Sequence, residues 1–359
     1  MDLEGSFIGF SQIMKKECFC LVVDAGDVGG QGQVTREAVI AVYNSAMRPV
    51  YVVGSHWTGD VCEDYYYDGE EELSFLYKCS AAPDSGTFSD AYRATTDMDS
   101  YTRCKQGRDA HLDSLVLAAA ITTMSMQGRT FDIDGLQEYM PCIFSTSWGY
   151  CASQEVCFKE MDNIGFYLIV PDERWFELAS RCGVKTIQLR VKDKPHDEVE
   201  RIIYMCANIA EKHDVKFILN DYWRFALKYN VHGVHLGQED IKKADLRRLS
   251  DAGLMLGIST HCYHELARAC YLKPSYIALG PIYSTTSKQM QFHTQGLSML
   301  KRWVMTSAHP VVAIGGISLS NIHDVINCGA KGYAVISAVN DAQDPVEAIM
   351  EFLSICDKC

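Results

Sequence analysis

The chain has 359 residues and a formal net charge of −13 at pH 7, which is enough length for more than one folded domain. No run of 18 uncharged apolar residues occurs, and Lys15, Lys16 and Glu17 interrupt the first 25 residues, where a signal peptide would place its apolar centre. The sequence therefore predicts a cytoplasmic protein with no membrane partner.

Fifteen cysteines are numerous for a chain of this length. An intracellular protein keeps its thiols reduced, and cysteine packs well as a small core residue. We therefore expect free thiols rather than a disulfide framework. Cys356 and Cys359 have the spacing of half a zinc site, but the sequence offers no evident second half.

The negative charge is concentrated in the N-terminal part. Residues 1–162 contain 25 acidic and 11 basic residues, whereas the remainder contains 21 and 22. Such an acidic region argues against nucleic acids and anionic membranes as partners. The near-neutral remainder can still form a local basic pocket for an anionic ligand.

The first elements in chain order carry little functional signal. Residues 50–54 are predicted to form a strand, residues 64–75 a hairpin that turns on Asp68-Gly69, and residues 112–124 an apolar helix. Ser, Gly and Cys dominate residues 145–163 and the periodicity fades there, which predicts a linker. The chain thus divides into a smaller α/β domain over residues 1–160 and a second domain over residues 163–359.

The second domain repeats one unit eight times, a short apolar strand followed by an amphipathic helix. The strands are predicted at residues 165–170, 186–191, 215–219, 233–236, 255–258, 276–279, 311–314 and 333–336. Residues 197–213 are typical of the helices, with apolar residues at helical spacing and charges on the opposite side. This alternation requires parallel strands, and eight units in about 190 residues predict a closed (β/α)8 TIM barrel. A doubly wound open sheet is the alternative.

The second strand ends in three polar side chains, Gln188, Arg190 and Lys192. Alternation along a strand places all three on one face, which points into the barrel or its mouth. Two inward cations without a carboxylate in the same motif are costly unless an anion joins them. We favour the phosphates of a ligand over a structural salt-bridge network.

Carboxylates follow the third and fourth strands. Asn220-Asp221 ends one strand, Asp240 follows the next, and adjacent strand ends of a barrel lie side by side. Two carboxylates facing a diphosphate suggest Mg²⁺, which takes one or two protein carboxylates and completes its shell with substrate oxygens and water. Either residue alone could instead cap a helix.

The fifth and sixth strands lead into hydroxyl groups. Ser259 and His261 follow the fifth strand, although Ser259 could be only the N-cap of a helix that begins near Tyr263. The loop after the sixth strand continues with a lysine-terminated run: Ser284, Thr285, Thr286, Ser287 and Lys288. This run suits an anionic group or a lid that excludes water, and a plain polar loop is the alternative.

The last two strands end in groups that fit a monophosphate. Gly315-Gly316 follows the seventh strand, and Ile336-Ser337 ends the eighth. Glycines let backbone N–H groups approach a ligand closely, and the corresponding loops of barrels often bind phosphate. The rim is therefore predicted to carry a metal-assisted diphosphate site and a separate monophosphate site. No Ser-His-Asp or Cys-His nucleophile arrangement is recognisable.

These motifs occur in the order found in a known enzyme family. They are QLRVK at residues 188–192, NDYWR at 220–224, GVHLGQED at 233–240, SYIALGPI at 275–282 and VAIGGIS at 312–318. Through them, the chain from about residue 163 to its end resembles bacterial thiamine phosphate synthase. The resemblance implies a transferase that condenses hydroxymethylpyrimidine diphosphate with thiazole phosphate, releasing diphosphate.

The resemblance also implies roles for individual residues. The pyrimidine diphosphate would be held by Gln188, Arg190, Lys192, Asn220, Ser259 and Lys288, of which Arg190, Lys192 and Lys288 also assist departure of the diphosphate. Mg²⁺ would be bound by Asp221 and Asp240. The thiazole phosphate would be received by Thr285, Thr286, Ser287, Gly316, Ile336 and Ser337. Ser284 and Ser287 depart from the family pattern, which commonly has Pro and Thr there; the loop is then expected to be more flexible when open.

Other functions stay open at this point. One alternative is a non-catalytic barrel that binds thiamine intermediates. Another is a relative such as the thiazole tautomerase, which shares the fold but handles only the monophosphate. The small-molecule substrates are the expected partners, and a homo-oligomer is compatible with the sequence.

The first 160 residues weakly resemble the C-terminal half of hydroxymethylpyrimidine phosphate kinases of the ribokinase fold, through residues 53–60 and 67–69. Ala110 and Leu112 replace the two glycines of the kinase phosphate turn. Asp113 would be a remnant of the base or, as we prefer, the N-cap of the following helix. We expect a shortened or degenerate kinase-like module in a fusion protein, with an active kinase or an unrelated α/β domain as alternatives.

Overall fold

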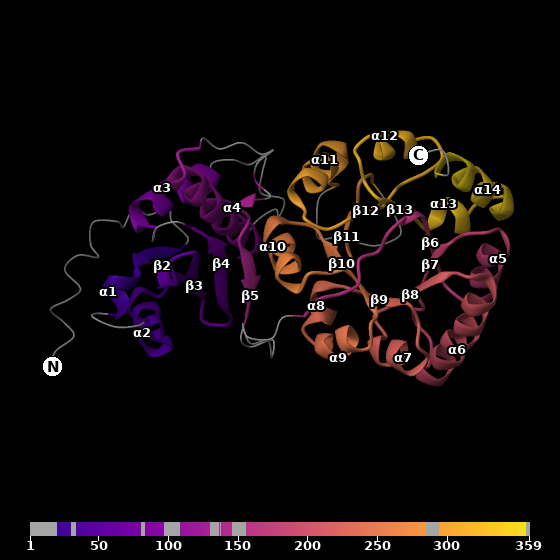
Figure 1. Ribbon diagram of the computed structural model, residues 1–359, viewed down its shortest axis with the longest axis horizontal. Helices are drawn as coiled ribbons and strands as arrows, with labels where there is room; N and C mark the ends of the chain where they lie inside the picture. The colour runs from indigo at the N-terminus through magenta and orange to yellow at the C-terminus, as the bar shows by residue number, and fades with distance from the viewer. Residues whose placement is uncertain are drawn as a thin grey trace.

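The computed structural model describes residues 20–29, 34–79, 83–96, 108–129, 136, 138–145, 156–284 and 294–356. Two parts lie side by side, an N-terminal sheet with its helices and a C-terminal barrel (Figure 1). Within the described residues, no helix is both long and apolar enough to span a membrane. The described cysteines are free thiols, as the sequence predicts.

The barrel consists of eight parallel strands, each paired with the next along the chain, and β13 closes the ring against β6. The strands are β6 (Gly165–Val170), β7 (Thr186–Leu189), β8 (Lys216–Asn220), β9 (Gly233–Leu236), β10 (Met255–Thr260), β11 (Tyr276–Leu279), β12 (Val311–Ile314) and β13 (Gly332–Val335). The helices are α5 (Glu173–Arg181), α6 (His196–His213), α7 (Trp223–Lys228), α8 (Gln238–Ile241), α9 (Leu246–Asp251), α10 (Tyr263–Leu272), α11 (Gly296–Thr306), α12 (Ile322–Ile326), α13 (Ser337–Asn340) and α14 (Pro345–Cys356).

The predicted (β/α)8 barrel is thus confirmed. Four strands have the predicted bounds, and the others differ by one or two residues at one or both ends. β7 stops at Leu189, two residues earlier than predicted, so Arg190 and Lys192 lie just beyond the strand. The open sheet that we considered as an alternative is wrong.

Two layers of apolar side chains stabilise the barrel. One fills the interior, where Tyr167, Tyr276 and Ala278 pack with neighbours from the other strands. The other lies between the strands and the surrounding helices. Gly257 leaves room for Tyr276, because a Cβ atom at residue 257 would lie only 2.1 Å from the ring of that tyrosine. The interior between the strands is therefore a packed core.

The N-terminal part contains one five-stranded sheet in the order β1-β2-β3-β4-β5. β1 and β2 are parallel, and the remaining pairs are antiparallel. Its strands are β1 (Leu21–Asp24), β2 (Val50–Trp57), β3 (Val61–Tyr67), β4 (Glu72–Lys78) and β5 (Cys142–Phe144). Its helices are α1 (Ala25–Gly29), α2 (Arg36–Ala46), α3 (Ser85–Thr96) and α4 (Arg108–Met126).

The predicted hairpin and helix of this part are confirmed. β3 and β4 pair with Tyr67 opposite Glu72, and the side chain of Asp68 accepts hydrogen bonds from the backbone of Glu70 and Glu71 in the turn. Gly69 has a φ of 94°, which favours glycine. The predicted helix at residues 112–124 lies inside α4, which begins at Arg108.

The two parts pack against each other through α10 of the barrel, which lies beside α4 and β5 (Figure 1). The rings of Phe144 and Tyr271 stack with centroids 5.0 Å apart. The described end of the predicted linker is also packed, since Val156 and Phe158 are buried. The N-terminal part therefore contacts the barrel by a specific surface.

Asp113 corrects one prediction. It lies inside α4 rather than at its start, so it is not the N-cap of that helix. Its carboxylate instead accepts a hydrogen bond from the backbone N of His264, at the start of α10, with a distance of 2.9 Å. No local pattern in the sequence reveals this contact, because the two residues are separated by 151 positions.

Candidate active site

A cavity of about 350 Å³ opens at the carboxyl ends of the barrel strands. In barrels of this kind, that face carries the chemistry because the strands deliver their end residues to it. Ten predicted residues line the cavity: Gln188, Arg190, Lys192, Asn220, Asp221, Asp240, Ser259, Gly316, Ile336 and Ser337. The predicted Thr285, Thr286, Ser287 and Lys288 lie outside the described residues.

The cations after β7 face the carboxylates after β8 and β9. Nζ of Lys192 lies 2.7 Å from Oδ2 of Asp221, and the two side chains are 44% and 27% exposed. Arg190 lines the same cavity and forms no ion pair with any residue that the structure describes. A solvent-accessible anion could therefore bind to Arg190 directly and compete for Lys192.

Asp221 is held in an unusual backbone conformation. Its φ is 64°, in the left-handed region that Asp tolerates better than most residues. Its backbone N donates to the carbonyl of His235 at 3.1 Å. The N-cap of α7 is Tyr222, whose side chain makes no capping hydrogen bond. The alternative of Asp221 as a helix cap is therefore wrong, and its carboxylate faces the cavity.

Asp240 lies in α8, the short helix after β9, and not at its N-cap. Burial raises the pKa of its carboxyl, and the nearby carboxylate of Asp221 raises it further. Two carboxylates that disfavour each other's charge are a suitable pair of ligands for a divalent cation, because the cation removes the repulsion. The donor set of oxygen atoms fits Mg²⁺.

A chain of buried hydrogen bonds crosses the bottom of the cavity, and the sequence analysis missed most of it. Nε2 of Gln188 donates to the hydroxyl of Tyr167 at 2.9 Å, and that hydroxyl lies 2.7 Å from the hydroxyl of Tyr276. Nδ1 of His235 lies 3.0 Å from the Tyr276 hydroxyl, and its Nε2 lies 2.9 Å from Oγ of Ser259. The predicted Gln188 and Ser259 are thus the two ends of one network.

His235 stays neutral in this network. Burial lowers its pKa from 6.5 to about 4, so at physiological pH one ring nitrogen donates a hydrogen bond and the other accepts. The network therefore fixes the orientation of a polar amide and a hydroxyl toward the cavity without adding charge. A signal did exist in the sequence, since Tyr167, His235 and Tyr276 interrupt otherwise apolar barrel strands.

The backbone of Ser259 is also held by a hydrogen bond from a side chain outside the cavity. It belongs to β10, and the N-cap of α10 is Cys262, so Ser259 is not a helix cap. Nε2 of Gln238 donates to the Ser259 carbonyl at 2.7 Å, and Nη1 of Arg268 donates to Oε1 of Gln238 at 2.8 Å. Arg268 belongs to α10, so the helix that packs on the N-terminal part also supports the cavity wall.

The opposite side of the cavity is lined by Gly315, Gly316, Ile336 and Ser337. Gly316 has a φ of 68°, and a Cβ atom there would lie 2.7 Å from Cβ of Tyr283 and 2.8 Å from the carbonyl O of Ser284. Only glycine fits this position, and it leaves the backbone accessible to a ligand. This side is separated from Asp221 and Asp240 by the width of the barrel mouth, which agrees with two binding regions.

The fold and the cavity together define a (β/α)8-barrel protein whose mouth is suited to anionic small molecules. Its sequence matches the thiamine monophosphate synthase family over residues 166–339. Thiamine-phosphate synthase of Photorhabdus laumondii is 45% identical over 195 residues, which cover 54% of this chain and 90% of that protein. The protein of the same name from Proteus mirabilis is also 45% identical over 195 residues, covering 91% of its length.

A solved structure agrees with these sequence relatives. Thiamine phosphate pyrophosphorylase from Pyrococcus furiosus superposes with a TM-score of 0.50 at 29% identity, covering 55% of this chain and 97% of that one. The chain therefore belongs to the thiamine-phosphate synthase family, whose members are transferases of thiamine biosynthesis. The resemblance predicted for the barrel is confirmed, and that of residues 1–160 to a kinase stays a prediction.

Proposed function

We propose that the barrel joins hydroxymethylpyrimidine diphosphate to thiazole phosphate and releases thiamine phosphate and diphosphate. Family membership supports this reaction. The main observation in this chain that supports the reaction is that one cavity is lined by two cations and two carboxylates: Arg190, Lys192, Asp221 and Asp240. A barrel that bound only a monophosphate would have no need for paired carboxylates opposite two cations.

The pyrimidine diphosphate binds on the side of β7 to β10. The amide of Gln188 and the hydroxyl of Ser259 offer hydrogen bonds to the polar edge of the pyrimidine, and the buried network behind them fixes both groups. Arg190, Lys192 and Asn220 lie where they can reach the phosphates. Lys288 belongs to this set by its place in the family motif.

Mg²⁺ is the cofactor that we assign to Asp221 and Asp240. Oxygen ligands suit this ion. The elevated pKa of Asp240 beside Asp221 indicates that a cation between the two carboxylates would stabilise their charged forms. When bound, the ion supplies positive charge against the diphosphate. Lys192, which pairs with Asp221 in this structure, would then be able to contact a phosphate oxygen.

The thiazole phosphate binds on the side of β12 and β13. Gly316 brings backbone close to the ligand, and the hydroxyl of Ser337 and the backbone of Ile336 complete this side of the cavity. The hydroxyls of Thr285, Thr286 and Ser287 belong to the same set by their place in the family motif. Binding the two substrates on opposite sides places the thiazole nitrogen in line with the reacting carbon.

The reaction needs no protein nucleophile. The carbon–oxygen bond to the diphosphate breaks first, its electron pair leaves with the diphosphate, and the electron-rich aminopyrimidine stabilises the cation that forms. The thiazole nitrogen then donates its lone pair to that carbon. Arg190, Lys192 and Lys288 stabilise the charge that develops on the departing oxygens.

We also propose that residues 1–160 form a domain without kinase activity. The position of the kinase base corresponds to Asp113, whose side chain is fully buried and bonded to the barrel. A general base must reach the hydroxyl of its substrate, and no substrate reaches a carboxylate in this environment. We place the protein in the cytoplasm, in agreement with its free thiols.

The decisive experiment measures diphosphate release by the full chain. We expect release only when Mg²⁺ and both substrates are present. Lys192→Ala should lower turnover at least about 100-fold, whereas Lys194→Ala should leave it unchanged, because Lys194 pairs with Glu198 on the surface. Replacing the pyrimidine diphosphate with the pyrimidine monophosphate plus ATP should give no product.

The outcomes of these assays distinguish the reaction, the site and the kinase. Without diphosphate release by the wild-type chain, the synthase assignment falls and a binding barrel or a tautomerase replaces it. Equal losses in Lys192→Ala and Lys194→Ala would contradict the site but not the reaction. Product from the monophosphate and ATP would show that the N-terminal domain is an active kinase.

A further inference from the structure

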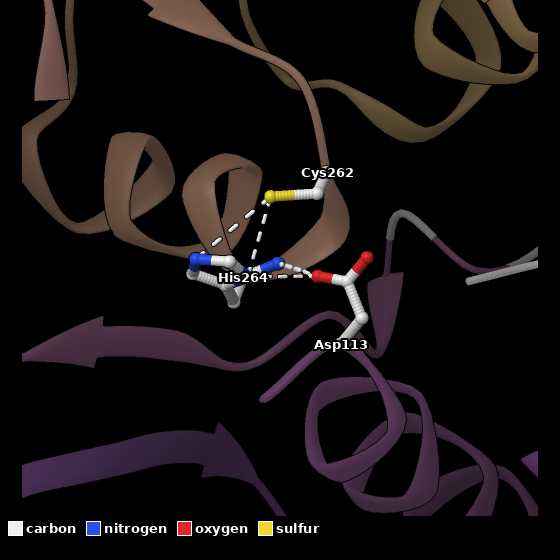
Figure 2. A group of neighbouring side chains, drawn as sticks. All are labelled: Asp113, Cys262 and His264. Atoms are coloured by element: carbon white, nitrogen blue, oxygen red, sulfur yellow. Dashed lines mark hydrogen bonds and ion pairs between the residues drawn. The ribbon is translucent and has the colours of Figure 1, made fainter. Parts of the chain in front are cut away.

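Three side chains with metal-binding atoms meet at the contact between the two parts of the chain (Figure 2). Asp113 comes from α4 of the N-terminal part, and Cys262 and His264 come from the start of α10 in the barrel. The exposed fractions are 0% for Asp113, 0% for Cys262 and 5% for His264. One donor atom from each lies within 4.8 Å of the other two.

Nδ1 of His264 is the common point of this cluster. It lies 2.8 Å from Oδ1 of Asp113 and 3.3 Å from Sγ of Cys262. Figure 2 shows the sulfur and the carboxylate converging on the imidazole from different sides. Donor atoms bound to one tetrahedral zinc ion lie roughly 3.3 to 3.7 Å apart. The sulfur–nitrogen distance of 3.3 Å is already in that range, and the nitrogen–oxygen distance of 2.8 Å would have to widen by about half an ångström.

Capping of α10 accounts for only one of the two oxygen atoms of the Asp113 carboxylate. Oδ1 accepts from the backbone N and the ring of His264. Oδ2 is buried and has no hydrogen-bond partner among the described residues. A buried carboxylate oxygen without a partner costs free energy, and a hydrogen-bond donor or a cation would remove that cost. Nothing in the proposed synthase reaction uses this oxygen.

We propose that Asp113, Cys262 and His264 bind a divalent transition-metal ion of the zinc type. This ion joins the two parts of the chain. On binding, the Cys262 thiol releases one proton to solvent and the thiolate, the neutral imidazole and the carboxylate each donate an electron pair. The charges of the ion, the thiolate and the carboxylate then sum to zero in a buried site. Oδ2 of Asp113 supplies a fourth donor if the carboxylate binds through both oxygens.

The donor set selects the class of ion. A thiolate with an imidazole favours zinc and its neighbours over magnesium or calcium, which prefer oxygen ligands. The site is therefore distinct in chemistry from the Asp221 and Asp240 pair at the barrel mouth. It is also distinct in purpose, since all three side chains are buried where the two parts of the chain meet and the ion would act as a structural link.

The test is the metal content of the full chain. The protein is stripped with a chelator and titrated with Zn²⁺ alone, and separately with Co²⁺ alone. We expect one tightly bound zinc per chain, and for Co²⁺ the near-ultraviolet absorption of a cobalt–thiolate bond. Removing the metal should lower Tm, because the ion joins residues that are separated by 151 positions.

Matched variants locate the site. Cys262→Ser and His264→Gln should each weaken zinc binding at least about 100-fold, and Cys262→Ser should abolish the cobalt–thiolate absorption. Cys328→Ser, a thiol outside the cluster, should retain both. The double variant Asp221→Asn with Asp240→Asn should also retain both, whatever happens to its synthase activity.

Three results would overturn the proposal. One is a stripped wild-type chain that stays folded by circular dichroism and binds no zinc. Another is stoichiometric zinc that survives in both Cys262→Ser and His264→Gln. The third is a cobalt complex without thiolate absorption, which would assign the ion to oxygen ligands. In each of them the cluster acts as a helix cap and a buried thiol only.

Discussion

At the scale of single residues, the polar groups that follow the strands could be predicted because alternation and strand ends place them at one mouth. Gln188, Arg190, Lys192, Asp221 and Asp240 meet there. Alternation does not say which buried polar groups support them. The sequence predicted no role for Tyr167, His235 and Tyr276, whose hydrogen bonds to one another join residues 41 and 109 positions apart.

The paired roles of the carboxylate and the loop lysine give a residue-scale prediction. Asp221→Ala and Lys288→Ala should each lower turnover by orders of magnitude, because each removes charge stabilisation from the departing diphosphate. Loss of the water-accessible ion pair to Lys192 should cost little stability, but Asp221→Ala should lower Tm slightly because alanine tolerates the φ of 64° at this position less well than Asp. The measurement is kcat with saturating substrates beside Tm. Near-normal turnover in both variants would contradict these roles.

At the scale of elements, the barrel strands could be predicted almost to the residue because a strand buried on both faces is short and continuously apolar. The ends of β7 and β10 were less predictable, since hydrogen bonding to the neighbouring strand decides where a ladder stops. In the N-terminal sheet, only β2 and the hairpin had clear signals. β5 has three residues, which is too few for a pattern.

The N-terminal hairpin carries a pH-dependent element. Asp64 of β3 is fully buried and accepts hydrogen bonds from Tyr51, Tyr77 and the backbone of Gly54. Burial raises its pKa from 3.8 to about 6, although these hydrogen bonds lower it. A raised pKa in the folded state means that the folded chain retains the proton longer than the unfolded chain. The resulting stabilisation is present below pH 3.8 and is lost as the pH rises through about 6.

We therefore expect Asp64→Asn to change the pH profile of unfolding. Between pH 5 and pH 7.5, the wild-type chain should lose about 1 kcal/mol of unfolding free energy that the variant does not lose. Denaturant unfolding of both proteins at the two pH values measures the difference, followed through the tyrosines of the N-terminal part. Parallel pH profiles would contradict the elevated pKa of Asp64.

At the scale of the whole molecule, the composition predicted an acidic N-terminal part beside a near-neutral barrel, but not how they meet. The contact depends on Asp113, on the stacking of Phe144 with Tyr271 and on burial of residues such as Phe158. Each of these pairs distant segments, and periodicity reports only on neighbours. The contact reaches the cavity because α10 also carries Arg268, which supports Ser259 through Gln238.

The central claim is that one bound diphosphate lies between the cations after β7 and the carboxylates after β8 and β9. A crystal structure of the full chain with Mg²⁺ and an unreactive pyrimidine diphosphate analogue tests it most directly. We predict that Arg190 and Lys192 contact the diphosphate while Asp221 and Asp240 bind a metal ion on its other side. A diphosphate bound elsewhere, or carboxylates too far from Arg190 to share that ligand, would contradict the account.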